Sequence, residues 1–144
     1  MTAGRRGYEF FEHTADVGAL VRGVTLGRLF ENAALAMCDL ACDRGTVRPR
    51  RRLAIAVRGD GLEDLLVRWL SEILYLQETR RWLFSAFRVA RVDRVRCAAR
   101  GVGLGEPYDE ARHPRPREIK AVTYHQLRVI RGRSAWRVRL VFDV

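Results

Sequence analysis

The chain has no apolar run near the length of about 20 residues that a membrane-spanning helix needs. Its first ten residues, MTAGRRGYEF, include arginines but no apolar stretch of signal-peptide length. It has few cysteines, and an odd number with no tight pairing pattern favours reduced thiols at Cys38, Cys42 and Cys97. We therefore expect a cytoplasmic protein that does not associate with a membrane.

Lysine is nearly absent as well, because Lys120 is the only one and every other basic side chain is an arginine. The formal net charge of +10 is typical of proteins that bind nucleic acids. GC-rich codons would, however, also put arginine wherever a solvated positive charge is tolerated. A run such as RPRRR at 48–52 is therefore equally well explained as a solvated face, and the sequence leaves direct contact with RNA open.

The length of 144 residues predicts a single domain, 1–144, in which residues 1–6 are disordered. Strands are expected at 8–12 and 17–24, joined by the loop HTAD, and at 53–57. The last of these strands has large residues on one face and alanines on the other.

Two amphipathic helices follow strands in this order. Thr25 can cap the first helix, which ends near Asp43-Arg44-Gly45, where Gly45 can take a positive φ. Asp60 and Glu63 form a variant of the capping box at the start of the second. Apolar residues recur at helical spacing at Leu26, Leu29, Phe30, Ala33, Met37 and Leu40, and at Leu62, Leu65, Leu66, Trp69, Ile73 and Leu76.

The second half of the chain indicates more strands, at 83–89, 92–102, 118–130 and 135–142, with a hairpin turn at 131–134. The glycines of GVGLG, 101–105, are interpreted as a strand end before a polar loop. The pattern Val-Arg-Gly before both helices suggests a duplicated strand–helix unit. We predict an α+β fold, a mostly antiparallel sheet with both helices packed on one face.

Oxygen ligands stand at unusual places, whereas nucleophile, phosphate-loop and zinc motifs are missing. Asp16 follows His13 in the first loop, Asp143 interrupts the last apolar strand, and the α-carboxylate of Val144 is one residue further. If these strands are neighbours, the carboxylates would repel by about 3 kcal/mol per pair at ~5 Å and an effective dielectric of ~20, which calls for a cation. The alternative is that Asp16 caps a turn and Asp143 is solvated.

The segment KAVTYH, 120–125, is the second unusual feature. A lone lysine in an arginine-rich chain suggests a site where a guanidinium does not substitute. His125 could be a buried strand residue or a functional one, with Tyr124 on the opposite face of the strand. His113, in the proline-containing loop, is expected to be exposed.

Together these residues resemble the archease family. The likeness starts at YEFFEHTADVG, 8–18, continues through LFENAALA, 29–36, and LEDLLVRWLSEILY, 62–75, and ends with KAVTYH and FDV. It spans nearly the whole chain. One departure is charge, because many archeases are rich in acidic residues.

The resemblance implies a protein that is no enzyme itself but activates RtcB-type RNA ligases in tRNA splicing, tRNA processing and RNA repair. Such ligases use GTP and manganese, and the archease promotes their guanylylation and multiple turnover. It also implies a divalent metal, calcium in crystals with magnesium or manganese as alternatives, bound by Asp16, Asp143 and the Val144 carboxylate, with His13 behind them. Lys120, His125 and Glu72 are candidates for the ligase contact, and contact with RNA would be indirect. The alternatives are an arginine-rich RNA-binding accessory module and a chaperone for RNA-modifying enzymes.

Overall fold

The computed structural model describes residues 7–13 and 16–144. The predicted disorder of residues 1–6 therefore lies outside the described residues, as do Thr14 and Ala15 of the HTAD loop. The elements in chain order are β1 (Tyr8–His13), β2 (Asp16–Gly23), α2 (Leu26–Ala41), the 3₁₀ turn η1 (Arg44–Thr46), β3 (Arg51–Arg58), α3 (Leu62–Thr79), β4 (Trp82–Asp93), β5 (Ala98–Pro107), β6 (Ala121–Val122), β7 (Val129–Arg131) and β8 (Trp136–Asp143).

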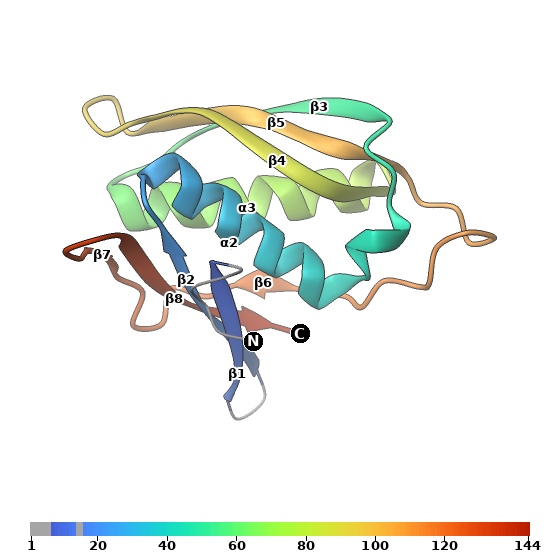
Figure 1. Cartoon of the computed structure of the whole chain (residues 1–144), viewed down its shortest axis with the longest axis horizontal. Helices are drawn as coiled ribbons and strands as arrows, with labels where there is room; N and C mark the ends of the chain where they lie inside the picture. Colours follow the sequence, from blue (N-terminus) through green and yellow to red (C-terminus); the bar gives the residue numbers. More distant parts are fainter. Residues whose placement is uncertain (1–6, 14–15) are drawn as a thin grey trace.

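The strands form two antiparallel sheets, with the helices between them (Figure 1). Sheet A has the order β1-β2-β8-β6, with β7 also paired to β8, and sheet B has the order β3-β5-β4. The α+β class, the antiparallel pairing and the packing of the helices on one face of a sheet are confirmed. The expectation of one shared sheet is wrong, because the helices separate two.

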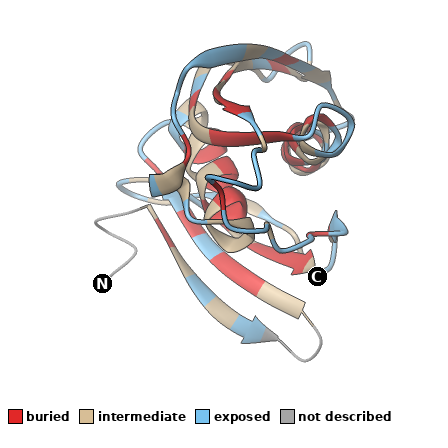
Figure 2. Ribbon diagram, turned by 90° about the vertical axis from the view of Figure 1, so that its right-hand side faces the viewer, coloured by how far each residue is buried: buried red, intermediate tan, exposed pale blue. Residues whose placement is uncertain are grey.

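Two covering layers are needed because the buried side chains of each helix extend beyond a single stripe. On α3, Val67 and Leu70 are buried in addition to the predicted stripe. On α2, Ala34 and Ala36 are likewise buried outside the predicted stripe. A helix that is apolar on several sides has to be covered on several sides. Accordingly, α2 contacts both β2 and β4, and α3 contacts β3, β4 and β6. Buried residues concentrate on the helices and on parts of the strands of both sheets (Figure 2).

The suggested duplication has a structural counterpart at the two strand-to-helix junctions. A β-carbon on Gly23 would lie 2.2 Å from the backbone nitrogen of Leu29, six residues on. A β-carbon on Gly59 would lie 2.7 Å from the same atom of Leu65, again six residues on. Each Val-Arg-Gly therefore ends where the strand passes directly against the first turn of the following helix, once in each sheet.

The helix caps are only partly as predicted. The side chain of Thr25 accepts a hydrogen bond from the Arg28 N–H at 3.1 Å, which confirms this cap. The capping box at the second helix is wrong: Gly61, with φ +94°, is the N-cap, and the Asp60 N–H donates to Asp64 at 2.8 Å. Gly45 has no positive φ, because it lies in η1, where its N–H donates to Asp43.

The predicted strand break near residue 90 and the early end at 102 are both wrong. β4 continues to Asp93, the turn is 94–97, and β5 runs on to Pro107. The glycines 101–105 lie within β5, the central strand of sheet B. They are required by close approach rather than by a loop, since a β-carbon on Gly105 would lie 1.9 Å from the Leu83 carbonyl oxygen.

The segment predicted as one strand, 118–130, is instead two short strands joined by a turn. Within this segment only β6 and β7 form strands that pair with β8. Tyr124 and His125 lie in or beside the intervening turn rather than on opposite faces of a strand. Glu63 in the first turn of α3 accepts a hydrogen bond from the Val129 N–H at 2.9 Å, which fastens the start of β7 to this helix.

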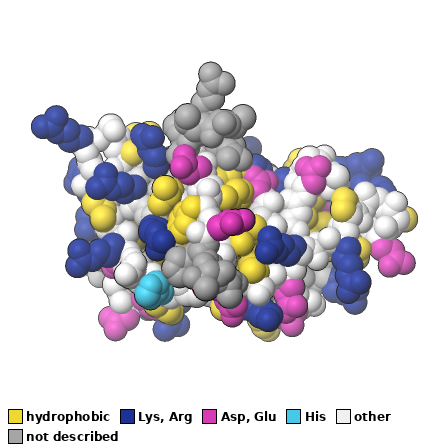
Figure 3. All heavy atoms as spheres, turned by 90° about the horizontal axis from the view of Figure 1, so that it is seen from below, with side chains coloured by type: hydrophobic (Ala, Val, Ile, Leu, Met, Phe, Trp, Pro, Cys, Tyr) yellow, Lys and Arg dark blue, Asp and Glu magenta, His cyan; other side chains and the backbone are white. Residues whose placement is uncertain are grey.

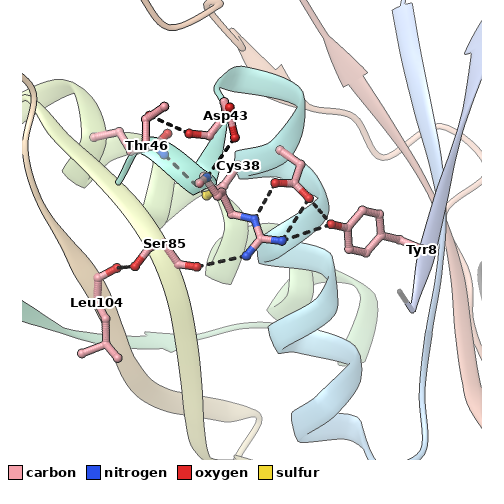
Figure 4. Close-up of polar contacts among 10 residues, drawn as sticks. Tyr8, Cys38, Asp43, Thr46, Ser85 and Leu104 are labelled. Carbon is pink, nitrogen blue, oxygen red and sulfur yellow. Dashed lines mark hydrogen bonds and ion pairs between the residues drawn. The ribbon is translucent and has the colours of Figure 1, made fainter. Parts of the chain in front are cut away.

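A polar network ties both sheets to α2 (Figure 4). Tyr8 of β1 donates to the Asp39 carboxylate, which also accepts from Arg44 at 2.5 Å. The same guanidinium donates to the backbone oxygen of Ser85 in β4 at 3.0 Å. Burial raises the pKa of Tyr8, and the hydrogen bond to Asp39 raises it further. Arg44 therefore connects sheet B to sheet A through one helix residue.

Candidate metal centre

The start of β2 and the end of β8 lie side by side, so that Asp16 is directly opposite Asp143 in the antiparallel register. The sequence had suggested that Asp16 lies in a loop, but it is the first residue of β2. Directly opposed residues project to the same face, with β-carbons about 4.5–5.5 Å apart. The inward-facing neighbours Val17 and Phe142 are also opposed and leave this aspartate pair on the outer face.

The KAVTYH segment begins at the same edge. Ala121 of β6 is opposite Asp143, and the Lys120 N–H donates to the Asp143 carbonyl oxygen at 2.8 Å. Lys120 is exposed. It directly precedes Ala121, so the antiparallel register places it beside Val144. The structure thus brings together Asp16, Asp143, Val144 and Lys120, four residues from three separate parts of the sequence.

His13 pairs with Asp16 through the β1–β2 register, but its side chain lies outside the described part of the chain. Among the described residues, no three histidine, cysteine, aspartate or glutamate side chains form a group that could hold a metal. The candidate ligands that the structure describes at this edge are therefore the two aspartates, with Val144 one residue further. Oxygen-only ligands of this kind suit calcium, magnesium or manganese.

The other two candidates for partner contact lie elsewhere: Glu72 is on α3, and His125 is in the connection between β6 and β7. Tyr124 donates to the Asp64 carboxylate at 2.6 Å, which fastens the connection to the first turns of α3. Hydrogen bonds from Tyr124, from Arg68 and from the Asp60 N–H lower the pKa of Asp64 to about 2. Glu72 lies two turns beyond Asp64 on the same helix face, half-buried. His125 is exposed, so its interpretation as a buried strand residue is wrong.

A buried cluster around Glu106 was missed by sequence reasoning. Glu106 accepts hydrogen bonds from the Arg48 N–H at 2.8 Å, from Arg112 at 2.5 Å and from His113 Nε2 at 3.0 Å. The Asp109 N–H donates to the other ring nitrogen of His113, which makes Nε2 the protonated one. The expectation that His113 is exposed is wrong, because it is 3% exposed. The signal was present as a glutamate seven residues before a histidine, but only the folded loop shows that they meet.

Figure 3 views the outer face of sheet A, where hydrophobic side chains gather near the middle with acidic side chains beside them. Basic side chains crowd the left of this view. Arg139 of β8 lies over the ring of Phe11 at 4.4 Å from its centroid, and Leu20 is 40% exposed. The aspartate pair therefore borders a partly apolar surface that a protein partner could cover.

Comparison with known proteins places the chain in a family. The model of the Archease protein family (MTH1598/TM1083) matches residues 8–144. The chain belongs to the archease family. The protein archease of Methanosarcina acetivorans is 41% identical over 139 residues, with 95% of each chain covered. That of Methanopyrus kandleri is 40% identical over 138 residues, covering 95% of this chain and 99% of its own.

Solved archease-family structures agree with the fold. The solution structure of Methanobacterium thermoautotrophicum protein 1598 has a TM-score of 0.84 and 33% identity, covering 96% of this chain and 99% of its own. A Thermotoga maritima crystal structure, described as an archease and possible chaperone, has a TM-score of 0.67 and 19% identity, which shows the shared fold. It covers 93% of this chain and 94% of its own. Within the described residues of this archease, no helix is long and apolar enough to span a membrane.

Proposed function

We propose that this archease is an accessory protein that activates an RtcB-type RNA ligase by promoting its guanylylation and multiple turnover. Membership of the archease family supports an accessory role. The single structural observation that carries the proposal is the opposition of Asp16 and Asp143 on two neighbouring strands. This edge is the docking end that we assign to the ligase.

The same residues provide a fit for a divalent cation. Like charges directly opposite one another on neighbouring strands repel, and a cation bound between them would relieve this repulsion. Asp16, Asp143 and the Val144 carboxylate would hold this ion through oxygen, and the ion would supply positive charge for coordination of a partner's oxygen ligands. Lys120, held at this edge by its backbone hydrogen bond to Asp143, adds a second positive charge for an acidic or phosphate group of the partner.

The other contact candidates extend this surface. His125 is exposed on the turn after β6, and Tyr124 fixes that turn to α3. Glu72 lies on the adjacent helix. A ligase seated on the aspartate edge could therefore reach the turn and α3 at the same time, while RNA is contacted through the ligase.

The deciding test compares wild type with the variant Asp16→Asn/Asp143→Asn. Removing both charges should weaken binding of calcium or manganese by roughly tenfold or more in calorimetric titration, and should abolish stimulation of ligase guanylylation measured with labelled GTP. Thermal unfolding without metal should be equal to or above that of wild type, because the repulsion is relieved.

The matched control is Asp60→Asn, an exposed aspartate at the start of α3, which should leave metal binding and stimulation unchanged. Full stimulation by the double variant would refute the role of this edge. A loss of stimulation with unchanged metal affinity would support the docking role of this edge and would refute metal binding by the two aspartates.

A further inference from the structure

The outer face of sheet B is an arginine surface. The three strands of this sheet and the β4–β5 turn carry arginines that are all exposed. They are Arg51, Arg52, Arg58, Arg88, Arg91, Arg94, Arg96 and Arg100. We define the arginine face by four of them, Arg58, Arg91, Arg96 and Arg100, which surround a hollow of about 570 Å³.

Small side chains form the floor of this hollow. Ala56 is opposite Arg100 and Ala98 is opposite Arg58 in the β3–β5 register, so each guanidinium rises beside an alanine. Because alanine side chains are short, the longer arginine side chains project beyond them and surround the hollow. Four arginines and one carboxylate, Asp93, therefore line the hollow, together with the alanines and Val57.

The positive charges of this face are hardly neutralised. Arg91 is directly opposite Arg100 across β4 and β5, an arrangement of like charges that is destabilising without an anion between them. No carboxylate among the described residues pairs with Arg58 or Arg100. The three strands carry two acidic residues. Glu106 is buried with Arg112, and Asp93 accepts from the N–H groups of its own turn while it also pairs with Arg91.

Asp93 weakens this positive field only slightly. Its carboxylate lies 3.5 Å from Arg91, and the backbone hydrogen bond from Arg96 is the main cause that lowers the pKa of this aspartate. One carboxylate thus faces four guanidinium groups. A guanidinium presents a planar fork of donors that matches two oxygens of a phosphate group.

We propose that the arginine face binds the phosphodiester backbone of base-paired RNA. No large hydrophobic residue on the strands of sheet B is exposed, and the β4–β5 turn exposes one, Val95. Protein-binding surfaces rely instead on clusters of apolar and aromatic anchors. The strands of this face also expose no aromatic side chain for stacking of unpaired bases. Phosphate contact without stacking is the way in which proteins recognise duplex RNA by shape.

The arginine face is independent of the aspartate edge, because sheet B is on the far side of the helices from it (Figure 1). The choice of RNA as the phosphodiester rests on the proposed function. The ligase would meet sheet A, and the RNA backbone would lie along sheet B. Both partners could thus be held at once, which turns an indirect contact with RNA into a direct one.

The test is fluorescence anisotropy of the full chain with a labelled RNA hairpin and with an unpaired strand of the same length. We expect the hairpin to bind more tightly, and the logarithm of its affinity to fall linearly with the logarithm of salt between about 50 and 200 mM. Arg58→Gln/Arg91→Gln/Arg100→Gln should lower the affinity roughly a hundredfold at about 0.1 M salt and reduce the slope by about 2–3.

The matched control is Arg22→Gln/Arg133→Gln/Arg137→Gln, which removes the same charge from the side of sheet A and should change affinity far less. Equal losses in both variants would mean that binding follows overall charge and would overturn the assignment to this face. Preference for the unpaired strand would overturn the assignment to duplex RNA. Competition by a glutamate-rich peptide at equal charge would show an acidic protein partner instead and would overturn the proposal.

Discussion

At the scale of single residues, glycines at the strand-to-helix junctions have opposite requirements although they are close in sequence. Gly23 ends β2 against the backbone of α2, at a distance that no β-carbon tolerates. Gly27 lies in the first turn of α2, where the nearest atom to an added β-carbon is 3.7 Å away. The chain therefore requires glycine at one position and merely accepts it at the other.

This contrast makes a paired prediction. Gly23→Ala should lower the free energy of unfolding by about 1–3 kcal/mol or more, because the backbones have to move apart. Gly27→Ala should raise it by about 0.5–1 kcal/mol, because alanine is less flexible in the unfolded chain and fits the helix. Urea unfolding of both variants measures the two effects. A stabilising Gly23→Ala would contradict the close approach of β2 and α2.

At the scale of elements, the loop that connects β5 and β6 is held by a buried carboxylate rather than by regular structure. Glu106 at the end of β5 binds Arg112 and His113, and it also binds the Arg48 N–H before β3. Burial of Glu106 raises its pKa, but hydrogen bonds from Arg48, His113 and Arg112 outweigh this and lower the pKa to about 2. The loop is thus fixed by a group that has to stay ionised.

The lowered pKa predicts a sensitivity to acid. The unfolded value of about 4.5 lies above the folded value, so ionised Glu106 stabilises the fold fully above about pH 4.5. This stabilisation should be lost as the pH falls toward 2. In Glu106→Gln the free energy of unfolding should be lower at pH 7 and should depend less on pH between about 4.5 and 2.

Urea unfolding at a series of pH values tests this, with the exposed Glu110→Gln as the control. Part of the dependence will remain in the variant, because the pKa of Asp64 is also lowered to about 2 by Tyr124, Arg68 and the Asp60 N–H. Identical pH profiles for wild type and Glu106→Gln would mean that this carboxylate does not hold the loop.

At the scale of the whole molecule, two sheets are joined across the helices by few polar groups. The most extended connection is that of Tyr8, Asp39, Arg44 and the Ser85 backbone oxygen, from sheet A through α2 to sheet B. Burial lowers the pKa of Arg44, but the bond to Asp39 raises it more, so this guanidinium stays charged. The network specifies how the layers are aligned, whereas the apolar core supplies most of the stabilisation.

Removal of the central cation should therefore be costly. Arg44→Met should lower the free energy of unfolding by about 1–3 kcal/mol, because Asp39 loses its charged partner while half-buried. In Asp39→Asn/Arg44→Met the loss should be smaller than the sum of the two single losses, since no unpaired charge remains. Additive losses in this double-mutant cycle would show that the two residues act independently.

The sequence by itself determined the local elements and the family. Helical periodicity and the Thr25 cap predicted both helices, and alternation predicted most strands, because these patterns depend on neighbours a few residues apart. It also marked Asp16, Asp143 and Lys120 as unusual. It was wrong in predicting an exposed His113 and a single strand at 118–130. Both errors concern contacts made in the folded chain: Glu106 holds His113 together with Arg48, which is 58 residues away, and Glu63 of α3 bonds Val129 after the turn.

Only the tertiary structure decided that there are two sheets, and that Asp16 is opposite Asp143 beside Lys120. It also gathered the arginines of sheet B into one face. Periodicity shows which side of a strand or helix is buried but not which element covers it. That choice depends on packing between distant segments. The same packing decides which charged residues of this protein lie next to one another.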